Sequence, residues 1–270
     1  MSHDAPTLKP RYQEHPRMFA DEPGYFILAI LLIPLIVGIV CLLTVFGIPI
    51  HIDASWLIIV ALVTWSLGSG YFPANYPGFQ IWVYWAMGLA AAVLLFVCVL
   101  LHELGHSLTA QRYGIPVTGV VLFIFGGVAQ IAHDPKRPGV EFMVAIAGPL
   151  VSVMIAALCF WASSVMPVES PLHLMAAAIV RYLAIINTCI LLFNLLPGFP
   201  LDGGRILRAG LWAWTGSLRQ ATRVTGTIGS ILGMGLIVLG VWMILKSRWI
   251  TGFWYIYLGG YLRNAARRSY

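Results

Sequence analysis

Charged residues are scarce in this sequence. Asp, Glu, Lys and Arg make up 10% of the 270 residues, whereas soluble domains carry about 25%. Residues 54–101 contain none of these and no His. This uncharged stretch is much longer than the about 20 apolar residues that a helix needs to cross a bilayer. Hydrophobic residues make up 60% of the chain. This composition excludes a soluble globular protein and predicts a polytopic membrane protein. The net charge of +6 is spread between apolar runs, which argues against nucleic-acid binding.

Cysteine is scarce as well, and we expect no cleavable signal peptide. The four cysteines lie inside apolar runs without CxxC spacing, which excludes a zinc finger or ribbon and predicts buried structural thiols. Residues 1–24 are polar and carry both signs of charge, so we do not expect them to form a signal peptide. The cysteines are Cys41, Cys98, Cys159 and Cys189.

Apolar runs separated by charged or turn-forming breaks predict the membrane spans. We expect an all-α polytopic membrane protein with a bundle of about six to seven transmembrane helices. The first run contains Pro34 and leads into residues 47–50. The sequence leaves open whether this run crosses the membrane, is re-entrant or forms partly a strand. The expected spans are 25–46, 54–70, 81–104, 140–166, 174–196, 224–246 and 249–262.

Two breaks between the spans carry distinct local patterns. Residues 68–80 are rich in Gly, Pro and aromatic residues, which predicts a turn where the chain leaves the hydrocarbon. Residues 115–131 are β-branched and aromatic with glycines, which predicts a short re-entrant β-hairpin between two helical spans. Because a sheet edge cannot face lipid, this hairpin must lie against protein or a wet cavity.

The basic residues predict the orientation of the chain. Only Lys246 and Arg248 fall in a predicted outer loop if the connections that hold the other basic residues after residue 53 face the cytoplasm. A complete crossing at 25–46 would place the basic residues of the N-terminal tail outside, so the side of the N-terminus stays open. The basic residues expected on the inner side are Arg112, Lys136, Arg137, Arg205, Arg208, Arg219, Arg223, Arg263, Arg267 and Arg268.

The strongest functional signal is the sequence His-Glu-Leu-Gly-His at 102–106, at the end of an apolar run. On a helix, His102 and His106 share one face, so both imidazoles can bind one metal ion while Glu103 reaches a metal-bound water. Neutral imidazoles suit zinc. Two histidines that satisfy buried polar groups would be the structural alternative. Burying two His and a Glu without a cation is costly, which favours the metal site.

Asp202 is the candidate for a third ligand, because catalytic zinc sites usually have three protein ligands. It follows Pro197 and Pro200, which end the apolar helix, and it precedes two glycines that permit non-helical backbone. Such backbone at membrane depth is tolerated where it lines a water-containing cavity. Alternatively, Asp202 is the N-cap of a helix over 206–211, which is compatible with the ligand role.

These residues resemble the site-2 protease family of intramembrane zinc metalloproteases. The paired motifs are HELGH at 102–106 and LDGGR at 201–205. The segment around Gly126 and Gly127 resembles the re-entrant segment of the family. Residues 147–149 and 47–56 also resemble family segments. The resemblance implies that His102, His106 and Asp202 bind one Zn2+ per chain and that Glu103 is the general base.

The resemblance also implies substrate-binding roles. Asn194 matches a family residue that helps to hold the substrate near the metal, although it could equally bond the backbone that Pro197 frees. The hairpin edge at Gly126 and Gly127 would accept an unwound substrate segment as an added strand.

By resemblance, the protein hydrolyses peptide bonds in or near transmembrane segments of single-pass membrane proteins, in regulated intramembrane proteolysis. An upstream site-1-type protease is then a candidate partner. We expect an integral protein of a prokaryotic cytoplasmic membrane, with the active site toward the cytoplasm.

Neither an inserted PDZ domain nor a C-terminal CBS pair is expected. Two other classes remain: a membrane metal-ion transporter, disfavoured because the polar residues converge on two motifs, and a non-enzymatic scaffold, disfavoured by the intact Glu103.

The expected division of the chain follows from these assignments. It consists of a polar N-terminal tail at 1–24, an apolar segment of open topology at 25–46, an intramembrane metalloprotease core at 47–223, and C-terminal transmembrane segments with a basic tail at 224–270.

Overall fold

The computed structural model of the chain describes residues 40–124 and 126–268. The expected polar tail at 1–24 and most of the apolar run at 25–46 therefore lie outside the described residues.

The helices confirm a polytopic helical membrane protein. Five segments of the described chain are long and apolar enough to cross a membrane. The first of them combines α2 (Ser55–Ser66), a π-helical turn (Leu67–Tyr71) and α3 (Phe72–Asn75); the others are α4 (Ile81–Arg112), α5 (Pro138–Val165), α6 (Pro171–Asn194) and α8 (Leu218–Leu245). Two further helices, α7 (Asp202–Thr215) and α9 (Trp249–Arg268), complete the helical part.

The predicted hairpin is present, but it belongs to a larger sheet. Strands β3 (Val117–Phe123) and β4 (Gly126–Ile131) pair antiparallel, as expected from residues 115–131. Strands β1 (Val40–Val45) and β2 (Ile48–Ile52) extend the sheet in the order β1-β2-β3-β4. The end of the first apolar run is thus a strand, which was one of the alternatives left open by the sequence.

Turn chemistry and apolar packing explain the added strands. Phe46 and Gly47 both adopt positive φ, at 51° and 79°, which suits a two-residue hairpin turn between β1 and β2. Strand β2 then pairs in parallel with β3. Ile50 and Val120 are buried together with Leu104 of α4. The sheet therefore packs directly on the helix that carries the His-Glu-Leu-Gly-His motif.

The predicted turn at 68–80 is wrong over its first part, because the chain stays helical through Asn75. A Cβ at Gly68 would lie 3.2 Å from the backbone of Tyr84 and Trp85 in α4, and one at Gly88 would lie 2.7 Å from the Thr64 carbonyl. The glycines therefore permit two helix backbones to approach closely rather than break the first helix.

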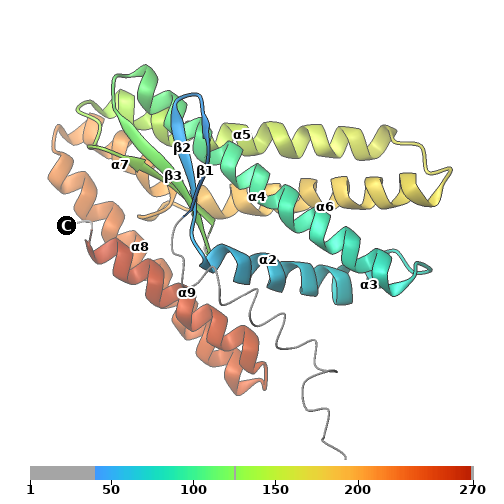
Figure 1. Cartoon of the computed structure of the whole chain (residues 1–270). Helices are drawn as coiled ribbons and strands as arrows, with labels where there is room; N and C mark the ends of the chain where they lie inside the picture. The colour runs from blue at the N-terminus through green and yellow to red at the C-terminus, as the bar shows by residue number, and fades with distance from the viewer. Residues whose placement is uncertain (1–39, 125, 269–270) are drawn as a thin grey trace, which may run out of the picture.

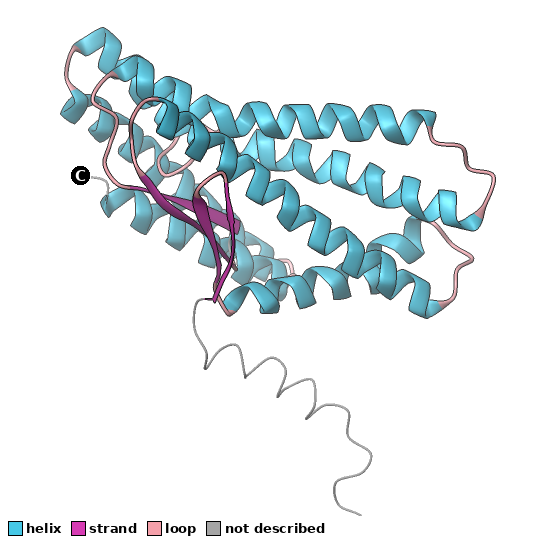
Figure 2. Ribbon diagram, turned by 45° about the horizontal axis from the view of Figure 1, so that its top comes forward, coloured by secondary structure: helices cyan, strands magenta, loops and turns pink. Residues whose placement is uncertain are grey.

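The helices form two groups around the sheet. Helices α5 and α6 run side by side and α4 crosses them obliquely, whereas α8 and α9 form an antiparallel pair that packs separately (Figure 1). The sheet lies toward one end of the helices (Figure 2). Helix α5 contacts α4, α6 and α7, so it lies between the two elements that carry the predicted metal ligands.

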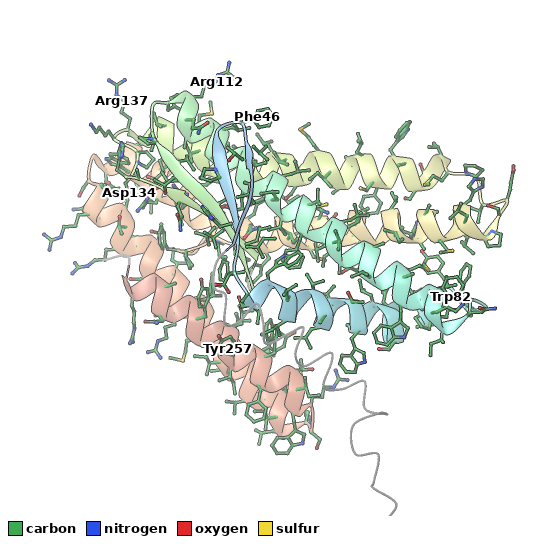
Figure 3. The ribbon with its side chains drawn as sticks, viewed as in Figure 1. Phe46, Trp82, Arg112, Asp134, Arg137 and Tyr257 are labelled. Atoms are coloured by element: carbon green, nitrogen blue, oxygen red, sulfur yellow. The ribbon has the colours of Figure 1, made fainter. Side chains whose placement is uncertain are left out.

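The two ends of the molecule differ in character. Arg112, Asp134 and Arg137 lie at one end, and Trp82 lies at the other (Figure 3). Because α4 begins beside Trp82 and ends at Arg112, its charged motif is closer to the basic end.

Candidate metal centre

Helix α4 brings the two histidines of the motif together. His102 and His106 are each 4% exposed, and their Nε2 atoms lie 3.2 Å apart. The helical repeat places residues four apart on one face, so this arrangement follows from the local sequence.

Asp202 reaches the same place from a distant part of the chain. It is the first residue of α7, with Leu201 as the N-cap and no side-chain hydrogen bond at that cap, so the predicted N-cap role is not observed. A Cβ at Gly203 would lie 2.6 Å from the Leu196 carbonyl oxygen, and one at Gly204 would lie 2.5 Å from the Phe199 nitrogen. The two glycines therefore let the start of α7 fold tightly against the preceding loop.

The three side chains form a compact donor set. The Asp202 carboxylate lies 3.1 Å from His102 Nε2 and 3.3 Å from His106 Nε2, and the three candidate ligand atoms lie within 4.8 Å of one another. A tetrahedral zinc ion with bonds of 2.0–2.1 Å holds its ligand atoms about 3.3 Å apart. The spacing of this donor set therefore fits a zinc ion.

The outer nitrogens of both imidazoles are also engaged. His106 Nδ1 donates to the carbonyl oxygen of Val144 at 2.7 Å, and His102 Nδ1 lies 2.9 Å from the Ser152 hydroxyl. When Nδ1 carries the proton, Nε2 presents a lone pair to the centre of the cluster. Two lone pairs and a carboxylate then converge, an arrangement that a bound cation stabilises.

Helix α5 supplies both outer contacts and also the space for the rings. A Cβ at Gly148 would lie 2.7 Å from His102 Nε2 and 2.6 Å from His106 Cε1. Gly148 lies between the turns that carry Val144 and Ser152. One face of α5 therefore determines the position of both imidazoles.

Burial by itself would raise the pKa of the Asp202 carboxyl. Without a metal ion the imidazoles place protons on Nε2, and hydrogen bonds and charge interactions from His102 and His106 then outweigh burial and hold this pKa well below its usual range. The same interactions favour the ionised carboxylate, which is the form that binds a metal.

Glu103 faces the same pocket from the next position on α4. Its Oε2 accepts a hydrogen bond from the Ala129 amide of β4 at 3.2 Å. A Cβ at Gly127 would lie 2.6 Å from Glu103 Cγ, so this glycine leaves room for the glutamate beside the strand.

The structure brings most of the predicted site residues around one pocket of about 220 Å3. Gly126 does not line it and instead begins β4. No site role for Arg205, Val144 or Ser152 was apparent from the sequence, and Gly148 was marked only as part of residues 147–149, which resemble a family segment. The predicted residues that line the pocket are His102, Glu103, His106, Gly127, Asn194 and Asp202, and Arg205 joins them.

The fold and the donor set together define a class, a helical membrane protein with a buried His-His-Asp cluster beside a glutamate. Comparison with known proteins identifies the family within this class. The model of peptidase family M50 matches residues 90–177 and 166–239. The chain belongs to this family of membrane zinc metalloproteases, which supports neither the transporter nor the scaffold alternative.

Individual relatives agree with the family. The protein sll0528 of Synechocystis sp., whose name places it among the zinc metalloproteases, is 38% identical over 226 residues, which cover 84% of this chain and 58% of that protein. The zinc metalloprotease MJ0392 of Methanocaldococcus jannaschii is 32% identical over 214 residues, which cover 77% of this chain and 57% of that protein. The chain thus spans somewhat more than half the length of these relatives.

A solved structure shares the fold. The site-2 protease from Methanocaldococcus jannaschii matches with a TM-score of 0.56 and 30% sequence identity, over 86% of this chain and 94% of that one.

Proposed function

We propose that the chain is an intramembrane zinc endopeptidase that cleaves single-pass membrane proteins in or near their transmembrane segments. One observation carries the proposal. A buried donor set of two His and one Asp shares a pocket with Glu103 and with the edge of β4. In this reading His102, His106 and Asp202 hold one Zn2+, which would lower the pKa of a bound water and polarise the scissile carbonyl.

Glu103 is the general base of the proposed reaction. The Ala129 amide holds one of its carboxylate oxygens, which leaves the other oxygen to take the proton of the attacking water. The same carboxyl group then passes a proton to the leaving amine. A glutamine at this position would keep the hydrogen bond from Ala129 but could not accept the proton.

The outer edge of β4 is the proposed substrate-binding strand. The Ala129 amide points to Glu103 and hence away from β3, whereas the Ala132 amide donates to Pro116 on the β3 side. Because backbone groups alternate along a strand, Gly127 and Ile131 also present their amides on the outer edge. An unwound substrate segment would pair here through main-chain hydrogen bonds.

Asn194 is proposed to hold the substrate opposite this strand. It is the last residue of α6 and lines the pocket of the metal centre. The alternative role of Asn194 was a hydrogen bond to the backbone that Pro197 frees. In the described part of the chain its side chain makes no such hydrogen bond. Its amide is therefore available to a substrate carbonyl.

We further propose that the pocket faces the cytoplasm. The motif of α4 lies toward the end of the molecule that carries Arg112 and Arg137 (Figure 3), and positive charges favour the cytoplasmic side. The proposed setting is a prokaryotic cytoplasmic membrane in which an upstream site-1-type protease first trims the substrate.

The test uses the full chain reconstituted in vesicles with a single-pass substrate that contains helix-breaking residues. Mass spectrometry of the products locates the cut. We compare wild type with Glu103→Gln, and with Glu169→Gln, which makes the same change in an exposed loop. Wild type and Glu169→Gln should cleave within the transmembrane segment, and Glu103→Gln should not cleave although it keeps its zinc.

Cleavage by Glu103→Gln at the wild-type rate would refute the assignment of the base. Cleavage confined to soluble loops of the substrate would refute the intramembrane specificity.

A further inference from the structure

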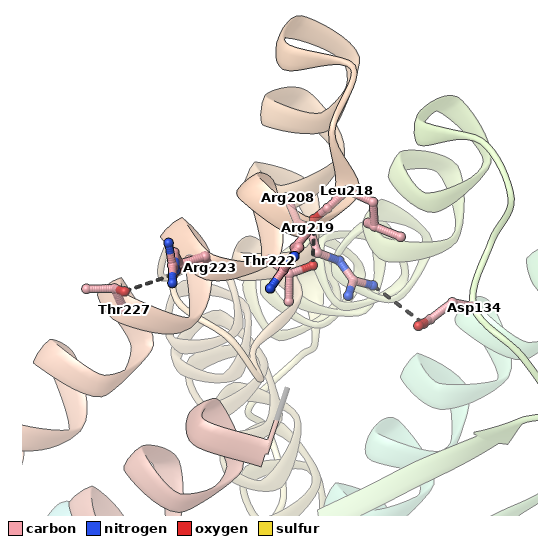
Figure 4. Close-up of a pocket in the computed structure, with 7 residues that line it drawn as sticks. All are labelled: Asp134, Arg208, Leu218, Arg219, Thr222, Arg223 and Thr227. Carbon is pink, nitrogen blue, oxygen red and sulfur yellow. Dashed lines mark hydrogen bonds and ion pairs between the residues drawn. The ribbon is translucent and has the colours of Figure 1, made fainter. Parts of the chain in front are cut away.

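A second pocket, of about 810 Å3, lies where α7 meets the start of α8 (Figure 4). It shares no lining residue with the pocket of the metal centre. It is lined by Asp134, Arg208, Leu218, Arg219, Thr222, Arg223 and Thr227.

The lining of this pocket carries a net positive charge. Among the described residues it contains three arginines and one acid. Arg208 is buried and pairs with Glu141 behind it, and its Nη2 lies 3.5 Å from Asp134. Since Arg208 is occupied by these acids, the net positive charge comes from the remaining two arginines.

Arg219 and Arg223 are both exposed on α8. They are four residues apart, so their side chains leave the same face of the helix. None of the ion pairs in the described residues involves Arg219. Guanidinium groups donate paired hydrogen bonds in a planar fork that matches phosphate oxygens.

The start of α8 adds to the positive potential. Leu218 and Arg219 are the first two residues of this 28-residue helix, and both line the pocket. The N-terminal end of a helix carries partial positive charge from its unpaired amides, which favours an anion there.

The depth of the pocket indicates where an anionic ligand would come from. Helix α8 is long and apolar enough to cross a membrane, and its apolar run follows Arg223, so the pocket at its first turns lies at the boundary between membrane and water. Asp134, which lines the pocket, lies at the same end of the molecule as Arg112 and Arg137 (Figure 3). Basic pockets between transmembrane helices on the cytoplasmic side suit anionic lipid headgroups.

We propose that this pocket is a binding site for a phosphate group, held by Arg219 and Arg223 at the N-terminal end of α8. The phosphodiester of an anionic phospholipid is the source that the depth of the site favours, and a soluble phosphate is the other source. The site is independent of the proposed peptidase activity.

The experiment measures lipid binding to the full chain, purified in detergent with zinc, by native mass spectrometry. Phosphatidylglycerol is titrated against phosphatidylcholine, and inorganic phosphate is added as a competitor in a parallel series. The pocket variant carries Arg219→Gln and Arg223→Gln. The control variant carries Arg112→Gln and Arg137→Gln, which remove the same charge from exposed positions at the same end.

Wild type should bind phosphatidylglycerol more tightly than phosphatidylcholine. The pocket variant should lose affinity for phosphatidylglycerol by roughly thirtyfold, since each arginine near an anionic headgroup contributes about fivefold. The control variant should change by less than about threefold. Competition by inorganic phosphate would assign the site to a soluble phosphate, and its absence would assign it to the lipid.

An equal loss in both variants would overturn the proposal, because general surface charge would then explain the binding. Unchanged binding in the pocket variant would overturn it as well. Zinc content, which the proposal expects to be equal in all three proteins, shows that each variant is folded.

Discussion

The substitution Gly148→Ala tests whether α5 determines the position of the metal-binding imidazoles. The added Cβ would lie 2.7 Å from His102 Nε2 and 2.6 Å from His106 Cε1, whereas ordinary contacts begin at 3.4 Å. The rings must therefore move by roughly 0.7 Å or more. Their Nδ1 atoms are held by Ser152 and Val144, so the rings cannot withdraw without breaking these hydrogen bonds.

The size of this displacement predicts the loss of zinc affinity. Functional metal sites require ligand distances within about 0.2 Å of their ideal values. A shift several times larger should weaken zinc binding by at least the tenfold to hundredfold that follows loss of an outer-shell partner, or about 1.4–2.7 kcal/mol. We expect Gly148→Ala to lose zinc to a chelator at concentrations that leave wild type loaded.

The assay is chelator competition on detergent-purified protein with metal analysis. Gly139→Ala is the matched control, because Gly139 lies in the first turns of the same helix and a Cβ there would meet nothing within 4 Å. This control should bind zinc as wild type does. Wild-type zinc affinity in Gly148→Ala would refute the view that α5 sets the histidine positions.

Three further predictions concern the same centre and its support. Ser152→Ala should weaken zinc binding about tenfold to hundredfold through the loss of a histidine partner, while Ser164→Ala on the same helix should not; equal affinities in chelator competition would contradict this. Asp202→Ala should lower zinc affinity by more than Ser152→Ala does in that assay, and retention of one zinc per chain at wild-type affinity would remove it from the ligand set. Arg208→Met should destabilise the protein by about 3–5 kcal/mol in thermal unfolding, because it leaves the buried Glu141 unpaired, and adding Glu141→Leu should restore part of the loss; a wild-type melting temperature for Arg208→Met alone would refute the importance of this pair.

Features that depend on local sequence were predictable. The long uncharged runs indicate membrane helices because the bilayer interior excludes charge. The spacing of His102 and His106 places both on one helical face whatever surrounds them. The β-branched pattern of residues 115–131 likewise predicted the hairpin formed by β3 and β4.

Two local patterns were read incompletely because packing decides their outcome. Gly68 resembles a turn signal in the sequence. In the structure it lies in a continuous helix, where the absence of a side chain lets the backbone of α4 approach closely. The end of the apolar run at 25–46 becomes β1, because the turn at Phe46 and Gly47 lets it pair with β2.

The sequence by itself determined a membrane protein with a helical His-Glu-His motif and identified Asp202 as the candidate third ligand. Only the tertiary structure decided which groups surround that motif. Ser152, Val144 and Gly148 act through contacts across helices, and about forty or more residues separate them from the histidines. A periodic pattern reports which face of a helix is buried, whereas the partner on the other side of the contact depends on how α4, α5 and α7 pack.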